Sequence, residues 1–392
     1  MGREGRSGPH TEGTGGTLEF GIFVQMFLPG PKAHDPASEH RAVLNELELI
    51  READRNNWKY VWCTEHHTLT EYSHLSASES FIAYALAQTD RIHVGSGIFP
   101  LNPVTNHPVR IAERVAMLDH LSEGRFEFGS GRGAGSHELG TFNVDPAETK
   151  ANWDEVIGEF TKMWDSFEYS HDGVAFSTPP RNVVPKPYGG GRTHPPMWVA
   201  AGNPPTYEKA ARHGLGVLGF NVAAIHDMKD HVDAYKAAIG EATPAGRFVN
   251  DNVMITNGLV CLEDGRKARE AACNMQISYL QSLVFLYHDT FPVPEGFTAW
   301  PNVMPEPTLD DIEGRIEAGF LLCGDPDEVT EQVRRYEQVG CDQVAFGLPV
   351  GLPQDLALET LRLFGQEVIP EFDRDPMHRS TRMRTGETVL QS

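Results

Sequence analysis

The sequence lacks the cysteine and hydrophobic patterns that would place it outside the cell or in a membrane. Its five cysteines contain no C-x-x-C pair and no regular spacing, which is typical of reduced thiols rather than of a disulfide framework. No stretch is both apolar and long enough to span a bilayer. Residues 1–17 are rich in glycine, threonine and charge, without the apolar core of a secretory signal. We therefore expect a cytoplasmic protein.

Positive charge is also scarce. The chain has 33 lysines and arginines against 55 aspartates and glutamates, which gives a formal charge of −22. This balance argues against a broad nucleic-acid surface and against attraction to anionic membranes. It leaves room for one bound phosphate group, because a single arginine or a helix N-terminus is enough to hold one. The expected partner is a small molecule, with no nucleic acid and no membrane.

Between a disordered tail expected at 1–17 and a flexible tail expected at 371–392, short apolar runs alternate with amphipathic segments. The strand candidates are 18–24, 60–63, 92–99, 126–131, 197–202, 215–221, 253–262 and 343–348. The helix candidates are 39–56, 77–88, 108–121, 147–165, 205–213, 227–239, 264–286 with 326–338, and 354–368.

Strands that are apolar throughout are typical of a parallel sheet covered on both faces, and eight strand–helix repeats are the number that closes a barrel. The pattern predicts a single α/β domain over 18–370, a (β/α)₈ TIM barrel. A doubly wound open sheet would require a linker between two halves, and the sequence has none. Two proline-rich segments, 166–195 and 287–318, interrupt the alternation. We expect them to form insertion loops at the C-terminal mouth of the barrel.

The segment Glu65-His66-His67 follows the apolar run 60–63. Ligands of parallel α/β folds bind beyond the C-terminal ends of the strands, and histidine exchanges protons near neutral pH. The pair could therefore be an acid–base site. It could also be a hydrogen-bonded structural pair, or a metal site with Glu65 or Glu71, although the spacing matches no metal motif. Because adjacent strand residues point to opposite sides, only one histidine should face the barrel axis.

The glycine-rich stretch 129–135 follows the strand residues Phe126 to Phe128. Gly129, Gly131 and Ala134 loosely fit a dinucleotide fingerprint, but that fingerprint belongs to the first strand of its domain, and this is the fourth strand. Glycines here could let the backbone approach a flat ligand, with Arg132 as a cation for an anionic group. A tight turn with a solvated arginine is an equally good interpretation.

A second phosphate candidate is the turn from Gly202 through Asn203 to Thr206, which leads directly into a helix. Backbone N–H groups at a helix start and the Thr206 hydroxyl can bind an anion. Helix capping by Asn203 or Thr206 explains the same residues.

Together these segments resemble the bacterial luciferase-like monooxygenase family. The resemblance extends from about Leu18 to Pro370 and is most specific over 60–142. It rests on the segments Thr64–Glu71, His107–Glu113, Leu118–Phe126 and Gly129–Gly133, and continues to Glu138 and Phe142.

The resemblance implies a TIM barrel that uses reduced FMN and O₂, with oxygen added at the flavin C4a carbon as a hydroperoxide. It places the proton-handling residue at His66 and the phosphate contacts at Arg132 and at Gly202, Asn203 and Thr206. The family often has a non-prolyl cis peptide beneath the flavin, which falls here near Ser96 and Gly97. The reactive cysteine of luciferase itself aligns with Gly131, so that thiol is absent.

The resemblance thus implies a two-component, FMNH₂- and O₂-dependent monooxygenase that acts on an apolar or carbonyl-bearing small molecule. A separate flavin reductase would supply the cofactor, and the chain would form a homodimer. One alternative is a hydride-transfer enzyme of the same superfamily that uses the deazaflavin F420. The other is a non-catalytic flavin-binding barrel, against which the retained histidine pair argues.

Overall fold

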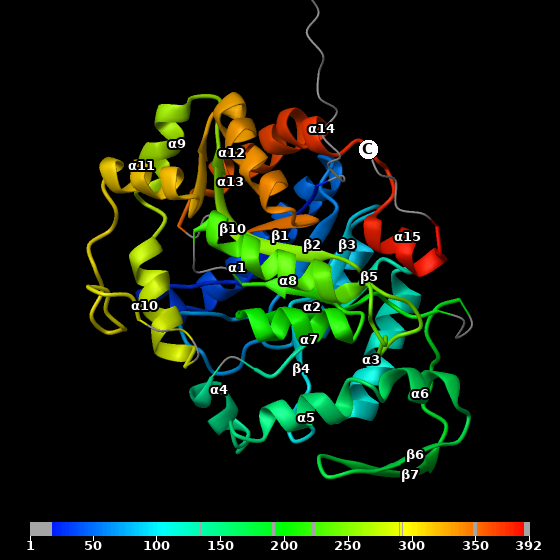
Figure 1. Cartoon of the computed structure of the whole chain (residues 1–392). Coiled ribbons are helices and arrows are strands. Elements are labelled where there is room, and N and C mark those ends of the chain that lie inside the picture. The colour runs from blue at the N-terminus through cyan, green and yellow to red at the C-terminus, as the bar shows by residue number, and fades with distance from the viewer. Residues whose placement is uncertain are drawn as a thin grey trace, which may run out of the picture.

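Eight parallel strands close into a ring in the computed structural model, which describes residues 18–133, 135–189, 193–220, 224–289, 291, 293–347 and 351–387. The ring is made of β1 (Glu19–Val24), β2 (Tyr60–Cys63), β3 (His93–Ser96), β5 (Phe126–Gly131), β8 (Met197–Ala201), β9 (Gly216–Gly219), β10 (Val253–Cys261) and β12 (Gln343–Gly347). Parallel pairing of β12 with β1, in the register Glu19 to Gln343, completes it. The predicted TIM barrel is confirmed (Figure 1).

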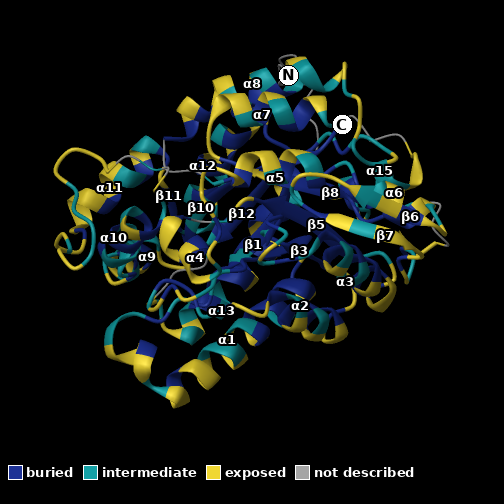
Figure 2. Ribbon diagram, turned by 90° about the horizontal axis from the view of Figure 1, so that it is seen from below, coloured by how far each residue is buried: buried dark blue, intermediate teal, exposed yellow. Residues whose placement is uncertain are grey.

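Helices pack around the ring and against its two ends (Figure 2). They are α1 (Pro36–Arg55), α2 (Ser78–Ala87), α3 (Pro108–Leu121), α4 (Ser136–Thr141), α5 (Thr149–Val156), α6 (Phe160–Asp165), α7 (Pro204–Arg212), α8 (Lys229–Ile239), α9 (Gly265–Ala272), α10 (Ile277–Tyr287), α11 (Leu309–Ala318), α12 (Pro326–Val339), α13 (Gln354–Leu363), α14 (Ile369–Phe372) and α15 (Arg379–Thr385). Within the described ranges, no helix has the length and apolar character needed to cross a membrane.

Large side chains fill the inside of the ring. Tyr60, Trp62 and Trp198 are fully buried there, and the two tryptophan rings meet edge to face with centroids 4.9 Å apart. The Trp62 indole donates a 2.6 Å hydrogen bond to Gln343 Oε1 across the barrel. Phe23 and Ile98 pack on this layer from the C-terminal side. The barrel is therefore solid below its mouth, and a ligand can bind only above these two residues.

The region 264–347 differs from the sequence prediction. The expected helix 264–286 is two helices, α9 and α10, separated where Gln276 adopts a positive φ of 51°. The segment 287–318 contains α11, which starts in a capping box between Thr308 and Asp311. The strand β11 (Leu321–Gly324) was not predicted; it pairs with the end of β10, beyond the ring. Four apolar residues before a helix are too short a signal to identify a strand.

The first proline-rich segment forms a β-hairpin instead of a loop over the mouth. Its strands are β6 (Tyr169–Asp172) and β7 (Ser177–Arg181), and they pair antiparallel. The hairpin lies beside α5 and α6 on the outer wall (Figure 1), where Phe176 contacts the His107 ring. None of the described residues of 166–195 lines the mouth. The expectation of a mouth loop is wrong here because the hairpin connects α6 to β8, which is the opposite end of the unit.

The chain end expected to be a flexible tail packs against the barrel over its described part, 371–387. The segment covers the N-terminal ends of the strands, where His378 Nε2 lies 2.9 Å from the Lys59 carbonyl oxygen. The Arg379 backbone N–H donates to Glu19 Oε1 at 2.9 Å, and Ser380 Oγ donates to Glu127. These polar contacts order the segment although its sequence is hydrophilic, which is why composition alone suggested a tail. Residues 388–392, like 1–17, lie outside the described residues.

Candidate active site

The polar residues that follow β2 are held by a hydrogen-bond network around Glu65. This buried carboxylate accepts bonds from Ser78 Oγ at 2.7 Å and from Asn106 Nδ2 at 3.0 Å, and it lies 3.3 Å from His67 Nε2. The hydrogen bond with Glu65 raises the pKa of His67. No group of three or more His, Cys, Asp or Glu that could hold a metal ion occurs among the residues described. Glu65 thus positions its neighbours through three contacts.

His66 and His67 point in different directions, but both lie in the loop beyond the end of β2, so strand alternation is not the cause. His66 lines a cavity at the mouth of the barrel, whereas His67 turns toward Glu65 and the Phe142 ring. His66 Nδ1 lies 3.4 Å from Glu138 Oε1, and the same oxygen accepts the His67 backbone N–H at 2.7 Å. Glu138 belongs to α4, so two βα connections together hold the histidine whose ring faces the cavity.

The mouth cavity has a volume of about 430 Å³, within the usual range for small-molecule sites. It is lined by Phe23, Glu65, His66, Tyr72, Gly97, Ile98, Gly131–Gly133, Lys150, Trp153, Val199–Asn203, Pro205, Thr206, Lys209, Ala210, Phe220, His288 and Phe291. The cavity therefore brings together His66, Gly97, Gly131, Arg132, Gly202, Asn203 and Thr206. Of the residues proposed from sequence, only Ser96 lies outside it.

One wall of the mouth cavity is backbone with little side chain. The peptide between Gly97 and Ile98 is cis, which confirms the position expected for this feature. Gly131 faces the same wall, and a Cβ there would lie 2.8 Å from the Ile98 side chain. Ser96 is fully buried and bonds both to the Gly129 carbonyl oxygen and to its N–H. Ser96 thus fixes the spacing of β3 and β5 behind this flat surface, which a planar ligand can approach closely.

Three cations line the mouth cavity in a chain that is otherwise acidic. Arg132 and Lys150 are exposed, and neither forms an ion pair with any carboxylate in the described part of the chain. Lys209 pairs with Asp154, and its Nζ lies 4.9 Å over the Trp153 ring. Two of these cations, Lys150 and Lys209, were missed because they lie on helices and follow no motif. Their convergence favours an anionic group such as a phosphate.

The turn before α7 offers few donors to an anion, as its two prolines predict. Pro204 and Pro205 have no N–H, and the Thr206 N–H and hydroxyl both donate to Asn203 Oδ1, at 3.1 and 2.9 Å. Asn203 therefore caps the helix, and the capping interpretation is confirmed. Gly202, Asn203 and Thr206 still border the cavity, but its positive charge comes from side chains.

Two further aromatic side chains line the cavity, and no motif in the sequence predicted them. Tyr72 and His288 lie 216 positions apart and join through a hydrogen bond of 3.0 Å between Tyr72 Oη and His288 Nε2. The His66 ring meets both, with centroids 5.3 and 5.9 Å away. Burial, followed by the nearby His66, lowers the pKa of His288 to about 3. Of the described residues of 287–318, His288 and Phe291 line the mouth cavity.

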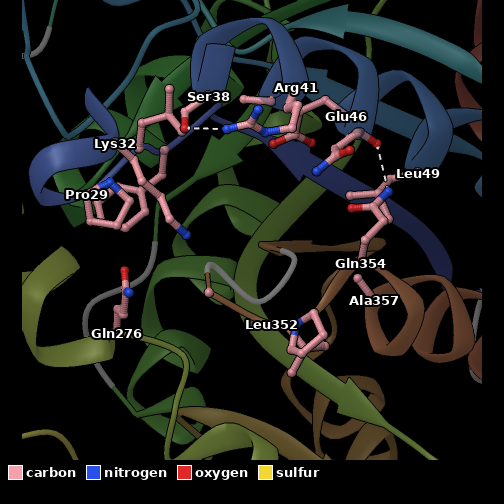
Figure 3. A pocket seen from close by; sticks show the side chains of 16 residues that line it. Pro29, Lys32, Ser38, Arg41, Glu46, Leu49, Gln276, Leu352, Gln354 and Ala357 are labelled. Carbon is pink, nitrogen blue, oxygen red and sulfur yellow. Dashed lines mark hydrogen bonds between the residues drawn. The ribbon is translucent and has the colours of Figure 1, made fainter. Parts of the chain in front are cut away.

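A second cavity of about 370 Å³ lies between the connections β1–α1 and β12–α13. Figure 3 shows Lys32 and Arg41 along its rim, with Gln276 and Leu352 on the facing side. Burial raises the pKa of Glu46, which lines this cavity, to about 7. It shares no lining residue with the mouth cavity. Its mixed charges do not select one class of ligand.

The fold and the mouth cavity define a TIM-barrel enzyme with a histidine, His66, beside a flat, cation-flanked pocket. The sequence model of the luciferase-like monooxygenase family matches residues 18–343. The chain belongs to this family, and it is a monooxygenase.

Relatives and solved structures agree with this assignment. The chain is 25% identical to limonene 1,2-monooxygenase from Rhodococcus erythropolis, over 92% of this chain and 88% of the relative. It is 24% identical to the oxygenase component of flavin-dependent trigonelline monooxygenase from Acinetobacter baylyi, over 92% and 98%.

Two solved structures share the fold. The first is the oxygenating constituent of 3,6-diketocamphane monooxygenase from Pseudomonas putida, in complex with FMN, with a TM-score of 0.71 at 17% identity over 91% of this chain and 99% of that one. The second is the F420-dependent tetrahydromethanopterin reductase from Methanopyrus kandleri, with a TM-score of 0.62 at 22% identity over 91% and 100%.

Proposed function

We propose that this protein is the oxygenase component of a two-component system, which uses reduced FMN and O₂ to oxygenate an apolar or carbonyl-bearing small molecule. The observation that carries the proposal is the mouth cavity, where a flat glycine-lined wall, three cations and His66 meet. A flavin has a planar ring system and a phosphate, and the residues of the cavity fit both parts. Bound reduced flavin would supply the electrons that activate oxygen.

The residues that would hold FMN come from the connections after β3 and β5. The ring system would lie against Gly97, Ile98 and Gly131, which line the cavity. The phosphate would lie near Arg132 and Lys150. Neither cation has a carboxylate partner in the described ranges, so a phosphate could bind without breaking an existing ion pair. This division of roles follows from shape and charge, and it gives the acidic chain one local site for an anion.

His66 would hold and move the proton that the reaction requires. Its Nδ1 faces Glu138, so the carboxylate can orient the ring and stabilise its charged form. The rings of Tyr72 and His288 cover His66 and limit the entry of water. A dry pocket matters because solvent would divert activated oxygen to H₂O₂.

The reduced flavin would come from a separate reductase, as the printed name of the trigonelline relative, an oxygenase component, suggests. We also infer a homodimer in the cytoplasm. Exposed apolar side chains on α2 and α3, namely Tyr84, Met117 and Leu121, offer a surface for the second copy.

The test is a titration of the purified protein with FMN and with F420, followed by oxygen-consumption assays with photoreduced FMN. We expect saturable FMN binding, with oxygen consumed when reduced FMN is supplied. Binding of F420 without FMN would overturn the proposal and favour the hydride-transfer alternative, for which the similarity to the Methanopyrus kandleri reductase is the supporting observation. Flavin binding without oxygen chemistry would favour a non-catalytic barrel.

A further inference from the structure

The segment after α10 fixes a second histidine in the mouth cavity. His288 follows the end of α10 directly and is held on both sides by the connection after β5. The Ser136 backbone N–H donates to Asp289 Oδ2 at 2.7 Å. Gly135 lies so close to Tyr287 that a Cβ there would be 1.9 Å from the Tyr287 carbonyl oxygen. The position of His288 is therefore set by specific contacts and does not result from loose packing.

His288 forms a neutral hydrogen-bonded pair with Tyr72. The Tyr72 side chain is 2% exposed, and its Oη lies 3.0 Å from His288 Nε2. Because burial lowers the pKa of His288 to about 3, its ring carries no charge near neutral pH. A neutral imidazole has one N–H donor and one acceptor nitrogen.

The pair always keeps one donor free. If Nε2–H donates to Tyr72 Oη, the tyrosine hydroxyl can donate elsewhere. If the tyrosine donates to Nε2, the free N–H is at Nδ1 of His288. No other described residue accepts a hydrogen bond from either side chain. In both tautomers a hydrogen-bond donor remains available at the wall of the cavity.

The surroundings of this donor are aromatic. The Phe220 ring is nearly parallel to His288, at 7° and 6.2 Å, and the Phe291 ring lies 5.5 Å from Phe220 and 5.6 Å from His288. Phe23 continues this surface, 6.5 Å from Phe220. The three cations that would hold the FMN phosphate come from the connection after β5 and from α7, and not from these rings. The ligand that fits is uncharged, apolar over most of its surface, and has one acceptor oxygen.

We propose that the Tyr72–His288 pair binds the carbonyl oxygen of the substrate, and that the substrate is a compact, uncharged cyclic ketone held between the phenylalanine rings. The pair is then the specificity determinant of the site. This inference rests on the proposed function, because it places the ketone beside the FMN wall. The phenylalanines bind the carbon skeleton, and the pair distinguishes a ketone from the hydrocarbon of the same shape.

The test compares 2-tetralone with tetralin, which has the same two-ring skeleton without the carbonyl. Binding of each probe is measured by calorimetry, both to FMN-loaded and to FMN-free protein. The proteins are the wild type, Tyr72→Phe, His288→Leu and the control His226→Ala, whose side chain is 75% exposed on the surface. Thermal unfolding and a separate FMN titration check that each variant folds and keeps its flavin site.

We expect the wild type and the control to bind 2-tetralone at least roughly tenfold more tightly than tetralin, by the usual size of one hydrogen bond to a buried donor. In Tyr72→Phe and His288→Leu this ratio should fall to about one to two, with the affinity for tetralin and for FMN within about twofold of wild type. An unchanged ratio in folded Tyr72→Phe would overturn the proposal, as would a wild type that does not discriminate. If the protein bound no FMN but still preferred 2-tetralone to tetralin, and this preference was lost in the two variants, only the proposed function would be overturned.

Discussion

At the N-terminal floor of the barrel, buried charged side chains pair with one another, whereas two cations at the mouth are exposed and have no carboxylate partner in the described ranges. In the floor, Lys59 Nζ lies between Glu19 at 2.6 Å and Asp373 at 2.8 Å. At the mouth, Arg132 and Lys150 line a cavity without carboxylate partners in the described ranges. Burying a charged side chain without a partner is costly, and the buried charges of the floor form ion pairs with one another. The mouth keeps them available for a ligand.

Histidines show the same contrast. His93 and His378 stack in the floor with ring centroids 3.7 Å apart, and burial lowers the pKa of both far below its usual range. His66 at the mouth keeps its side chain 13% exposed and faces Glu138. One residue type thus serves packing at one end of the barrel, and at the other end it has the proposed role in proton transfer.

The largest expected effect of a single substitution on stability is at the floor. Lys59→Met should lower the free energy of unfolding by roughly 3–5 kcal/mol, because it leaves Glu19 and Asp373 buried without a cation. Urea denaturation measures the change. The control Lys229→Met removes an ion pair whose side chains are 54% and 57% exposed, and it should cost less than about 1 kcal/mol. Equal costs for the two variants would remove the distinction between floor and surface charges.

At the mouth, the expected effect is on chemistry with little change in stability. His66→Ala should lower the rate of substrate oxygenation roughly 10²- to 10⁴-fold and release H₂O₂, because the proton-handling group is gone. Product and peroxide are quantified with photoreduced FMN, and FMN binding should be retained. His226→Ala is the control for loss of a histidine. Unchanged oxygenation in His66→Ala would show that another residue manages the proton.

A smaller effect concerns the phosphate. Arg132→Met should weaken the binding of FMN by roughly 10- to 100-fold, the usual worth of a charged hydrogen bond, and leave riboflavin affinity unchanged because riboflavin has no phosphate. Fluorescence titration with both ligands gives the ratio. Arg110→Met, on the outer face of α3, is the matched control. If the variant lost the same affinity for FMN as for riboflavin, the phosphate would not bind at Arg132.

The smallest expected effect is the pH dependence of the floor. Burial raises the pKa of Glu127 to about 8, so the folded state holds a proton that the unfolded chain releases above about pH 4.5. Stability should therefore fall as pH rises from 7 to 8, by up to ~1 kcal/mol, and stay level in Glu127→Gln. Urea midpoints across this interval measure it. A wild type whose stability rises over the same interval would contradict a protonated Glu127.

The sequence was sufficient to predict the barrel because eight apolar runs alternate with helices at regular spacing. It was insufficient for β11, a four-residue strand outside the ring, and for the chain end, whose order depends on contacts with Glu19, Lys59 and Glu127. Hydrophobic periodicity carries no information about such polar contacts.

The candidate site divides in the same way. His66, Gly131 and Arg132 occur in local motifs at strand ends, so their place at the mouth could be predicted. Lys150 and His288 reach the cavity from a helix and from a distant connection, and only the closed barrel brings them together.

The most direct test of the central claim, that the mouth cavity is the FMN site, is a crystal structure of the protein with FMN. The account predicts the flavin ring against Gly97, Ile98 and Gly131, the phosphate within hydrogen-bonding distance of Arg132, and His66 beside the ring. FMN bound in the second cavity near Glu46, or at the mouth with its phosphate away from Arg132 and Lys150, would contradict it.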